Sequence, residues 1–250
     1  MKNKLKLFSL LLVIGLVSST VLTSCDDDDD PSDGTFRVVA NVHIDGQAVD
    51  LNDMKYVNAS GNTYSVVRFK AALSKMRVNK SGVGDLMIDS EHLVDITDPA
   101  SMTIYEGTIA GGDYESVTFI FGLDSTMNIR GAYPNPPFSN FEWPMMLGAD
   151  VGYHYMQLDG FYDGSSGMDP YNTHAGPTQG VHYHSEYTFP VQFEIDGGTT
   201  TATIDINLNN FYNGPNAWDF SVVPTAIMPL PAWQVSLREN AEDVFSVTVN

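Results

Sequence analysis

Most side chains able to bind a metal ion lie in one central stretch, residues 141–184, which holds four of the six histidines. The candidate side chains in this stretch are His154, His174, His182, His184, Met145, Met146, Met156 and Trp143. Imidazole binds copper, zinc, nickel and iron, and the thioether of methionine adds a preference for Cu(I). The mixture therefore predicts a soft-metal site and favours copper over calcium or magnesium.

The spacing of these residues suggests which of them share a face. If residues 152–158 form a strand, alternation places His154 and Met156 on the same side. The same rule puts His182 and His184 on a common face, where a His-x-His pair can hold one ion. His174 is expected in a loop, which favours a ligand role over packing. For His154 the alternative is an ordinary strand histidine, and for Met156 it is a core position.

A second interpretation belongs to a different class of protein, a glycan- or protein-binding module. Its binding surface would be an aromatic platform made of Trp143, Tyr153, Tyr155, Phe161 and Tyr162. A third interpretation, a hydrolase, would pair the carboxylates of Glu142, Asp159 or Asp163 with His154. The sequence has no nucleophile motif and no H-E-x-x-H arrangement to support it, so we expect a protein that is not an enzyme.

The N-terminus predicts export and lipid attachment. Three early lysines precede an apolar run that ends in Leu22-Thr23-Ser24-Cys25, and this run is too short to span a bilayer comfortably. The pattern is typical of a bacterial lipoprotein signal over residues 1–24, with lipidation of Cys25 after cleavage. Because Cys25 is the single cysteine, no disulfide is expected in the exported domain. The predicted location is the outer membrane, where the lipid anchors the chain.

Residues 25–34 are predicted to form an acidic tether. Asp26–Asp30 form a like-charged run that cannot pack. Such a run after the lipidated cysteine resembles a surface-export signal, and the alternative is a plain spacer. The whole sequence carries a net charge of −19, which becomes −22 once residues 1–24 leave with three lysines and no acids. Nucleic acid is therefore excluded as a partner.

Residues 35–250 are predicted to form one all-β domain, an antiparallel β-sandwich with long loops. Phe36, Val38, Ala40 and Val42 alternate with other residues, as in a strand with one buried face. Residues 187–195 and 200–208 flank the turn Asp196-Gly197-Gly198 and predict a hairpin. Residues 124–138 are expected to form a long irregular loop, and residues 228–245 a short helix before a last strand.

Several segments together resemble one known family, the methanobactin-associated periplasmic (MbnP-like) proteins. The similar segments cover most of the chain from residue 36 to residue 249. They are Leu73–Val78, Leu93–Pro99, Trp143–Met146, Gly152–Gly160, His174–Gly176, Ile204–Leu208 and Asn240–Phe245.

The resemblance implies an exported β-sandwich, often a lipoprotein, that binds copper. It implies His174 and His154 as the first ligands and Trp143 as a residue that is oxidised to kynurenine. That oxidation implies a partner, a di-haem peroxidase of the MauG-like type. This chain departs from the pattern in two places: the segment after Trp143 is longer, and His182-Tyr183-His184 has no counterpart.

Overall fold

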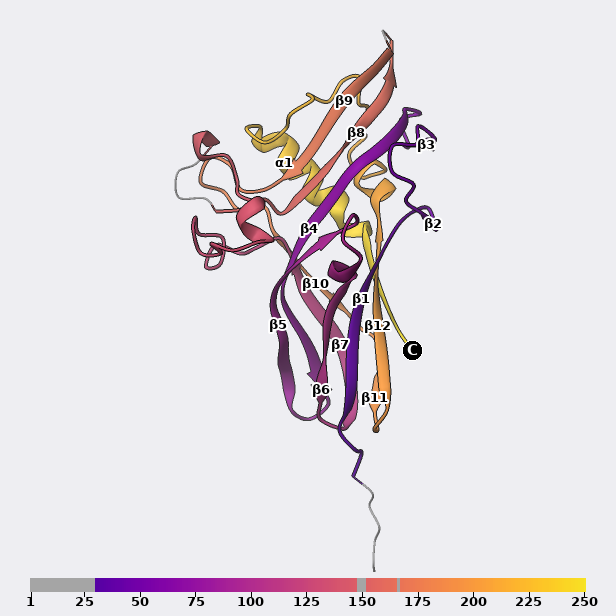
Figure 1. Cartoon of the computed structure of the whole chain (residues 1–250), viewed down its shortest axis with the longest axis vertical. Coiled ribbons are helices and arrows are strands. Elements are labelled where there is room, and N and C mark those ends of the chain that lie inside the picture. The colour runs from indigo at the N-terminus through magenta and orange to yellow at the C-terminus, as the bar shows by residue number, and fades with distance from the viewer. Residues whose placement is uncertain (1–29, 148–151, 166) are drawn as a thin grey trace, which may run out of the picture.

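The computed structural model describes residues 30–147, 152–165 and 167–250 (Figure 1). The predicted signal, residues 1–24, and the predicted lipidation site Cys25 lie outside these residues. Within the described part of the chain, no helix has both the length and the apolar character needed to cross a membrane.

Strands dominate the described residues. In chain order they are β1 (Gly34–Ile44), β2 (Gln47–Ala48), β3 (Tyr56–Val57), β4 (Thr63–Lys80), β5 (Gly84–Asp95), β6 (Thr103–Ile109), β7 (Gly112–Phe121), β8 (Met156–Gly164), β9 (Gly167–Ala175), β10 (Ser185–Phe189), β11 (Phe193–Ile195), β12 (Thr199–Asn207) and β13 (Phe245–Val249). The helix is α1 (Pro231–Asn240), and short 3-10 turns are η1 (Pro99–Met102), η2 (Phe138–Asn140), η3 (Met145–Leu147), η4 (Leu208–Tyr212) and η5 (Ala241–Asp243).

The first sheet is built around β1. In the described residues its order is β13-β12-β1-β2, with β6 on β1. Every second residue of β1 is buried, Phe36 and Val38 completely, as the alternation in the sequence predicts. The sandwich prediction is confirmed, although β1 and β12 run parallel, with Thr35 opposite Thr199 and His43 opposite Asn207.

The predicted hairpin over residues 187–208 is wrong. β10 and β11 both pair with β7 in the second sheet, whereas β12 lies in the first sheet beside β1. The turn at Gly197 and Gly198, both with positive φ, therefore carries the chain from one sheet to the other. The stacking of Phe193 on Phe36, with ring centroids 5.1 Å apart, joins the two sheets near this turn.

The second sheet depends on β4, which is 18 residues long. Its first half pairs with β8 and its second half with β7 along the same edge, while β5 pairs with the second half from the other side. The partner of β4 changes from β8 to β7 between Ala71 and Leu73, and Lys75, with φ of +49°, lies at the irregularity in the β7 and β5 ladders just beyond this point. β4 thereby connects the two-sheet body to the β8–β9 hairpin at the top of Figure 1.

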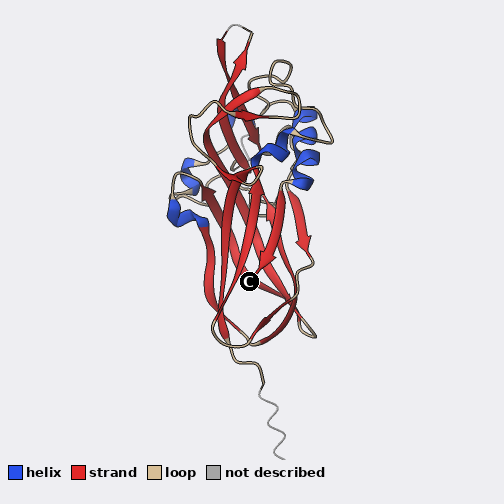
Figure 2. Ribbon diagram, turned by 90° about the vertical axis from the view of Figure 1, so that its right-hand side faces the viewer, coloured by secondary structure: helices blue, strands red, loops and turns tan. Residues whose placement is uncertain are grey.

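Apolar side chains fill the space between the sheets, whose strands run along the long axis (Figure 2). Phe245 of β13 packs against Phe119 and Phe121 of β7, with centroids 5.5 Å and 5.2 Å apart. At the β8–β9 end, Tyr171 of β9 stacks on Phe220 at 4.4 Å. Burial of aromatic rings supplies much of the apolar stabilisation in such a core, so both ends are held without disulfides.

Two segments pack near the β8–β9 hairpin. The predicted irregular loop is confirmed, since residues 124–138 contain turns and only the start of η2. The predicted helix is α1, which begins at Pro231, where a missing N–H costs nothing. Figure 1 shows α1 beside β8 and β9, and residues 123–147 projecting to the left of the view.

Candidate metal centre

The β8–β9 hairpin sets the register of the central polar residues. Gln157 lies opposite His174, and Asp159 lies opposite Asn172. Because side chains alternate along strands, Gln157, Asp159 and His174 project from one face of this sheet. Arg68 of β4 lies opposite Asp159 and extends the same polar group.

Two predicted ligands meet beside the tryptophan. The ring centroids of His154 and His174 are 5.1 Å apart, with the rings nearly perpendicular. The Trp143 ring lies 4.8 Å from the His154 ring. The exposed fraction is 5% for His154, 8% for His174 and 1% for Trp143, so the group lies in the protein interior.

Each histidine has one nitrogen held by a fixed acceptor. The Nδ1–H group of His154 donates to the carbonyl oxygen of Phe141 at 3.0 Å. The Nε2–H group of His174 donates to Oδ1 of Asp159 at 2.7 Å. These acceptors leave the lone pairs on Nε2 of His154 and on Nδ1 of His174. Nδ1 of His174 is buried and has no hydrogen-bond partner among the described residues.

The surroundings of the His154–His174 pair shift the pKa values of two groups in directions that favour a bound cation. Burial, and after it the nearby His174, lowers the pKa of His154 to about 3, so this ring is neutral at neutral pH. Burial raises the pKa of Asp159, but the His174 hydrogen bond and the charge of Arg68 outweigh it, and the net shift is downward. The site therefore combines a neutral imidazole with an ionised carboxylate behind the second ring.

A short bridge brings Trp143 to His154, although the two residues are eleven positions apart in the sequence. Glu142 and Tyr153 form an antiparallel bridge, and the backbone N–H of Trp143 donates to the carbonyl of Gly152 at 2.9 Å. Arg130 donates to the Trp143 carbonyl at 2.7 Å. The longer segment after Trp143 is thus spanned by a bridge at its base, and it does not displace the tryptophan from the histidines.

Gly176 allows the tryptophan ring to approach the backbone. A Cβ atom at this position would lie 2.3 Å from Cζ3 of Trp143, closer than any real contact. A glycine is therefore required next to the end of β9 if the ring is to occupy its place.

The helix fixes the backbone of the same segment. Gln234 of α1, which is 1% exposed, donates to the His174 carbonyl at 2.8 Å and accepts from the Gly176 N–H at 3.0 Å. This pair of bonds satisfies the His174 carbonyl and the Gly176 N–H at the end of β9. The backbone at His174 is thus held from the hairpin on one side and from the helix on the other.

The pair fits a copper ion that accepts imidazole nitrogen. Two rings that share one ion at bond lengths of about 2 Å have centroids roughly 5–6.5 Å apart, and the observed separation lies in this range. The two nitrogens that the fixed acceptors do not use, Nε2 of His154 and Nδ1 of His174, are imidazole nitrogens, a donor type that copper binds. In the part of the chain that the structure describes, no group of three or more His, Cys, Asp or Glu side chains could hold an ion.

The five predicted ligands therefore do not form one site. Met156 is completely buried in the apolar core and alternates with Gln157, whose amide nitrogen lies 3.4 Å from both His154 ring nitrogens. The predicted shared face of His154 and Met156 is wrong, because β8 begins only at Met156. His174 was expected in a loop and lies in β9 instead.

His182 and His184 form a second pair, with other neighbours. They precede β10, so the expected strand does not include them, and their ring centroids are 6.3 Å apart. Nδ1 of His182 and the Tyr155 hydroxyl are 3.0 Å apart. Burial lowers the pKa of both histidines, against the opposing charge of Asp124.

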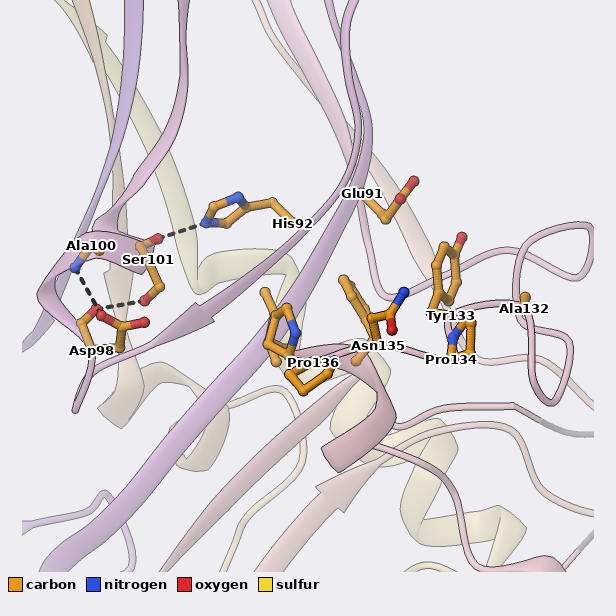
Figure 3. A pocket seen from close by; sticks show the side chains of 13 residues that line it. Glu91, His92, Asp98, Ala100, Ser101, Ala132, Tyr133, Pro134, Asn135 and Pro136 are labelled. Carbon is orange, nitrogen blue, oxygen red and sulfur yellow. Dashed lines mark hydrogen bonds between the residues drawn. The ribbon is translucent and has the colours of Figure 1, made fainter.

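The aromatic platform of the alternative interpretation is wrong. Trp143, Tyr153 and Tyr155 are buried, with exposed fractions of 1% or less. Phe161 is exposed, but one exposed ring does not make a platform. An open pocket with a volume of about 520 Å³ lies elsewhere, between β5, η1 and the proline-rich loop. Figure 3 shows His92 of this pocket turned toward Ser101, whose carbonyl lies 2.7 Å from its Nε2.

Sequence reasoning missed the residues that hold the ligands. Asp159 was considered only as a hydrolase carboxylate, and the roles of Arg68, Gln234 and Gly176 were not foreseen. A hairpin register for residues 156–175 would have placed Asp159 near His174. The contact of Gln234 depends on how α1 packs, and no local pattern indicates it.

Fold and site together define a two-sheet all-β protein with a buried histidine pair beside a tryptophan. Comparison with known sequences and structures identifies its relatives. The chain belongs to the MbnP family, whose family model matches residues 33–229. Its structure is similar to that of MbnP from Methylosinus trichosporium, with a TM-score of 0.56 and 12% sequence identity over 87% of this chain and 99% of that chain. At this identity the likeness concerns the fold. No curated protein matches the sequence.

Proposed function

We propose that this chain binds copper for uptake or handling and does not act as an enzyme. The observation that carries the proposal is the His154–His174 pair, in which each ring has one nitrogen held by an acceptor. Of the two remaining nitrogens, Nδ1 of His174 has no hydrogen-bond partner among the described residues, and Nε2 of His154 faces only the Gln157 amide at 3.4 Å. A ring held in this way presents its lone pair in a fixed direction, which is how proteins orient metal-binding histidines. Membership of the MbnP family supports the same assignment.

The proposed place of action is the cell envelope. The lipoprotein signal and Cys25 support attachment to the outer membrane, and the acidic run after it supports exposure at the cell surface. The net charge of −19 supports a role with cations and disfavours nucleic acid as a partner.

Trp143 is the proposed site of oxidation to kynurenine, and a di-haem peroxidase of the MauG-like type is the proposed partner. The support is the position of Trp143 against His154, with Nε1 of the indole buried and without a partner among the described residues. An oxidised ring at this position would place a new polar group beside the histidine pair.

The test is purification of the protein from its native host, followed by elemental analysis and intact-mass measurement. We expect about one copper per chain, and the mass change of one tryptophan converted to kynurenine. The His174→Ala variant, purified in parallel, should lose the copper. A wild-type protein without copper, after growth in copper-replete medium, would overturn the proposal.

A further inference from the structure

The carboxylate of Asp159 contacts the candidate metal centre without offering it an oxygen. Oδ1 accepts the Nε2–H of His174 at 2.7 Å, and Oδ2 accepts the Nε–H of Arg68 at 2.6 Å. Arg68 also makes an ion pair with Oδ2 through Nη2. Both oxygens are therefore engaged by protein donors, and through Oδ1 the carboxylate supports the His174 ring.

The two faces of Asp159 differ in their surroundings. Toward His174 the carboxylate is buried, whereas toward Arg68 it lines an open pocket with Lys70, Thr97 and Asn172. Arg68, whose side chain is 43% exposed, thus anchors the carboxylate from the solvent side. A charge-assisted hydrogen bond of this kind is stronger than one between neutral groups.

We propose that Asp159, anchored by Arg68, is a positioning residue that holds His174 in the tautomer with its proton on Nε2 and thereby assigns Nδ1 to the metal. His154 is held in the opposite tautomer by the Phe141 carbonyl, so the two histidines present different nitrogens, Nε2 and Nδ1. This inference rests on the proposed copper function.

The physical reason is the competition between the two neutral tautomers. Without an acceptor at Nε2, the proton of His174 can move to Nδ1, which has no other partner among the described residues and would then be closed to a metal. A carboxylate behind a ligating imidazole also raises its basicity, and loss of such a partner lowers metal affinity by about 10–100-fold.

The first measurement uses metal-free protein, so it does not depend on copper. Long-range proton–nitrogen correlation NMR of nitrogen-15-labelled protein reports which ring nitrogen carries the proton, and His174→Gln assigns the signal. In the wild type we expect His174 to carry it on Nε2. In Asp159→Ala the signal should move toward the other tautomer, and Asp159→Asn, which keeps an oxygen acceptor, should shift less and serves if the alanine variant does not fold.

The second measurement is a Cu(I) titration against a chromophoric competitor. We expect Asp159→Ala to lower the affinity about 10–100-fold and Asp159→Asn to lower it less. Asp163→Ala is the matched control, because Asp163 is an exposed carboxylate on the same strand, opposite Met168, and should leave both readouts unchanged.

The outcomes separate this inference from the function it rests on. A changed tautomer with unchanged Cu(I) affinity, in a protein that loses copper in His174→Ala, would overturn the role of Asp159 and leave the copper site standing. Unchanged affinity in both His154→Ala and His174→Ala would overturn the proposed function and this inference with it. A wild-type His174 that carries its proton on Nδ1 would overturn the inference alone.

Discussion

The protein has two histidine pairs, and they differ in how their rings are held. His154 and His174 come from segments twenty residues apart, with rings 5.1 Å from each other, and each gives one nitrogen to a fixed acceptor. His182 and His184 are two positions apart in sequence, yet their rings are 6.3 Å apart. Within the described part of the chain, His182 has a hydrogen-bond partner, the Tyr155 hydroxyl, and Nδ1 of His184 has none.

The difference shows that closeness in sequence does not make a ligand pair. The first pair is positioned by the β8–β9 register and by the bridge between Glu142 and Tyr153. The second pair precedes β10 and lacks a ladder that would direct both rings to one point. A carboxylate, a carbonyl and a helix residue support the first pair, so it is the pair for which we propose copper binding.

The largest expected effect is on copper binding. His154→Ala and His174→Ala should each weaken Cu(I) binding by at least about 100-fold, because a single buried imidazole then remains. His182→Ala and His184→Ala should leave the affinity within about threefold. Competition titrations measure all four variants, and circular dichroism checks their folding. A large loss in the second pair and none in the first would reverse the comparison.

The next effect concerns the packing of the tryptophan. Gly176→Ala adds a methyl group 2.3 Å from Cζ3 of Trp143, and we expect a loss of about 1–3 kcal/mol in the free energy of unfolding. Urea denaturation measures this change. Gly214→Ala is the control, because an added Cβ there meets no atom within 4 Å. Equal stability of the two variants would show that the tryptophan ring can move away from β9.

Acidification should distinguish the buried histidine from an exposed one. The pKa of His154 is about 3 in the folded protein and 6.5 ordinarily. Between these two pH values His154 binds a proton in the unfolded chain and stays unprotonated in the folded chain. The contribution of His154 to the free energy of unfolding is therefore fully present above pH 6.5. It is lost as the pH falls from 6.5 toward 3, by at most about 1.4 kcal/mol per pH unit.

Urea denaturation between pH 7 and pH 4.5 measures this slope in metal-free protein. His154→Gln should reduce the slope, and His43→Gln, which changes a partly exposed histidine of β1, should preserve it. If the free energy of unfolding of His154→Gln kept the same slope with pH, the acid sensitivity would come from a group other than His154. Asp159 contributes only at lower pH, because its lowered pKa keeps it ionised through this range.

The fold was predictable where one strand faces the core. The alternation of Phe36, Val38, Ala40 and Val42 gave β1 and its buried face correctly. Local patterns failed where pairing is decided by distant segments. The arms around Asp196–Gly198 have the composition of a hairpin, but their partners are β7 and β1, and no local signal shows that the turn crosses between sheets.

The site was predictable in its residue types and less so in its geometry. The sequence singled out His154, His174 and Trp143, and the structure brings the three rings together, while their role as a site stays a prediction. Met156 was misplaced because the strand was expected to begin four residues early, and a strand assigned over the wrong residues assigns the wrong faces. Gln234 lies sixty residues from His174, so its contact follows from tertiary packing alone.

The smallest expected effect is on stability, and it tests whether the second pair has any structural role. Nδ1 of His184 is buried without a partner among the described residues, so His184→Leu removes an unsatisfied polar atom and should change the free energy of unfolding by less than about 1 kcal/mol. His174→Leu instead takes a hydrogen-bond partner from buried Asp159 and should cost about 1–3 kcal/mol. Urea denaturation of metal-free protein at pH 7 compares the two. A larger loss in His184→Leu would mean that the second pair stabilises the fold more than the first, and the contrast between the pairs would then concern copper only.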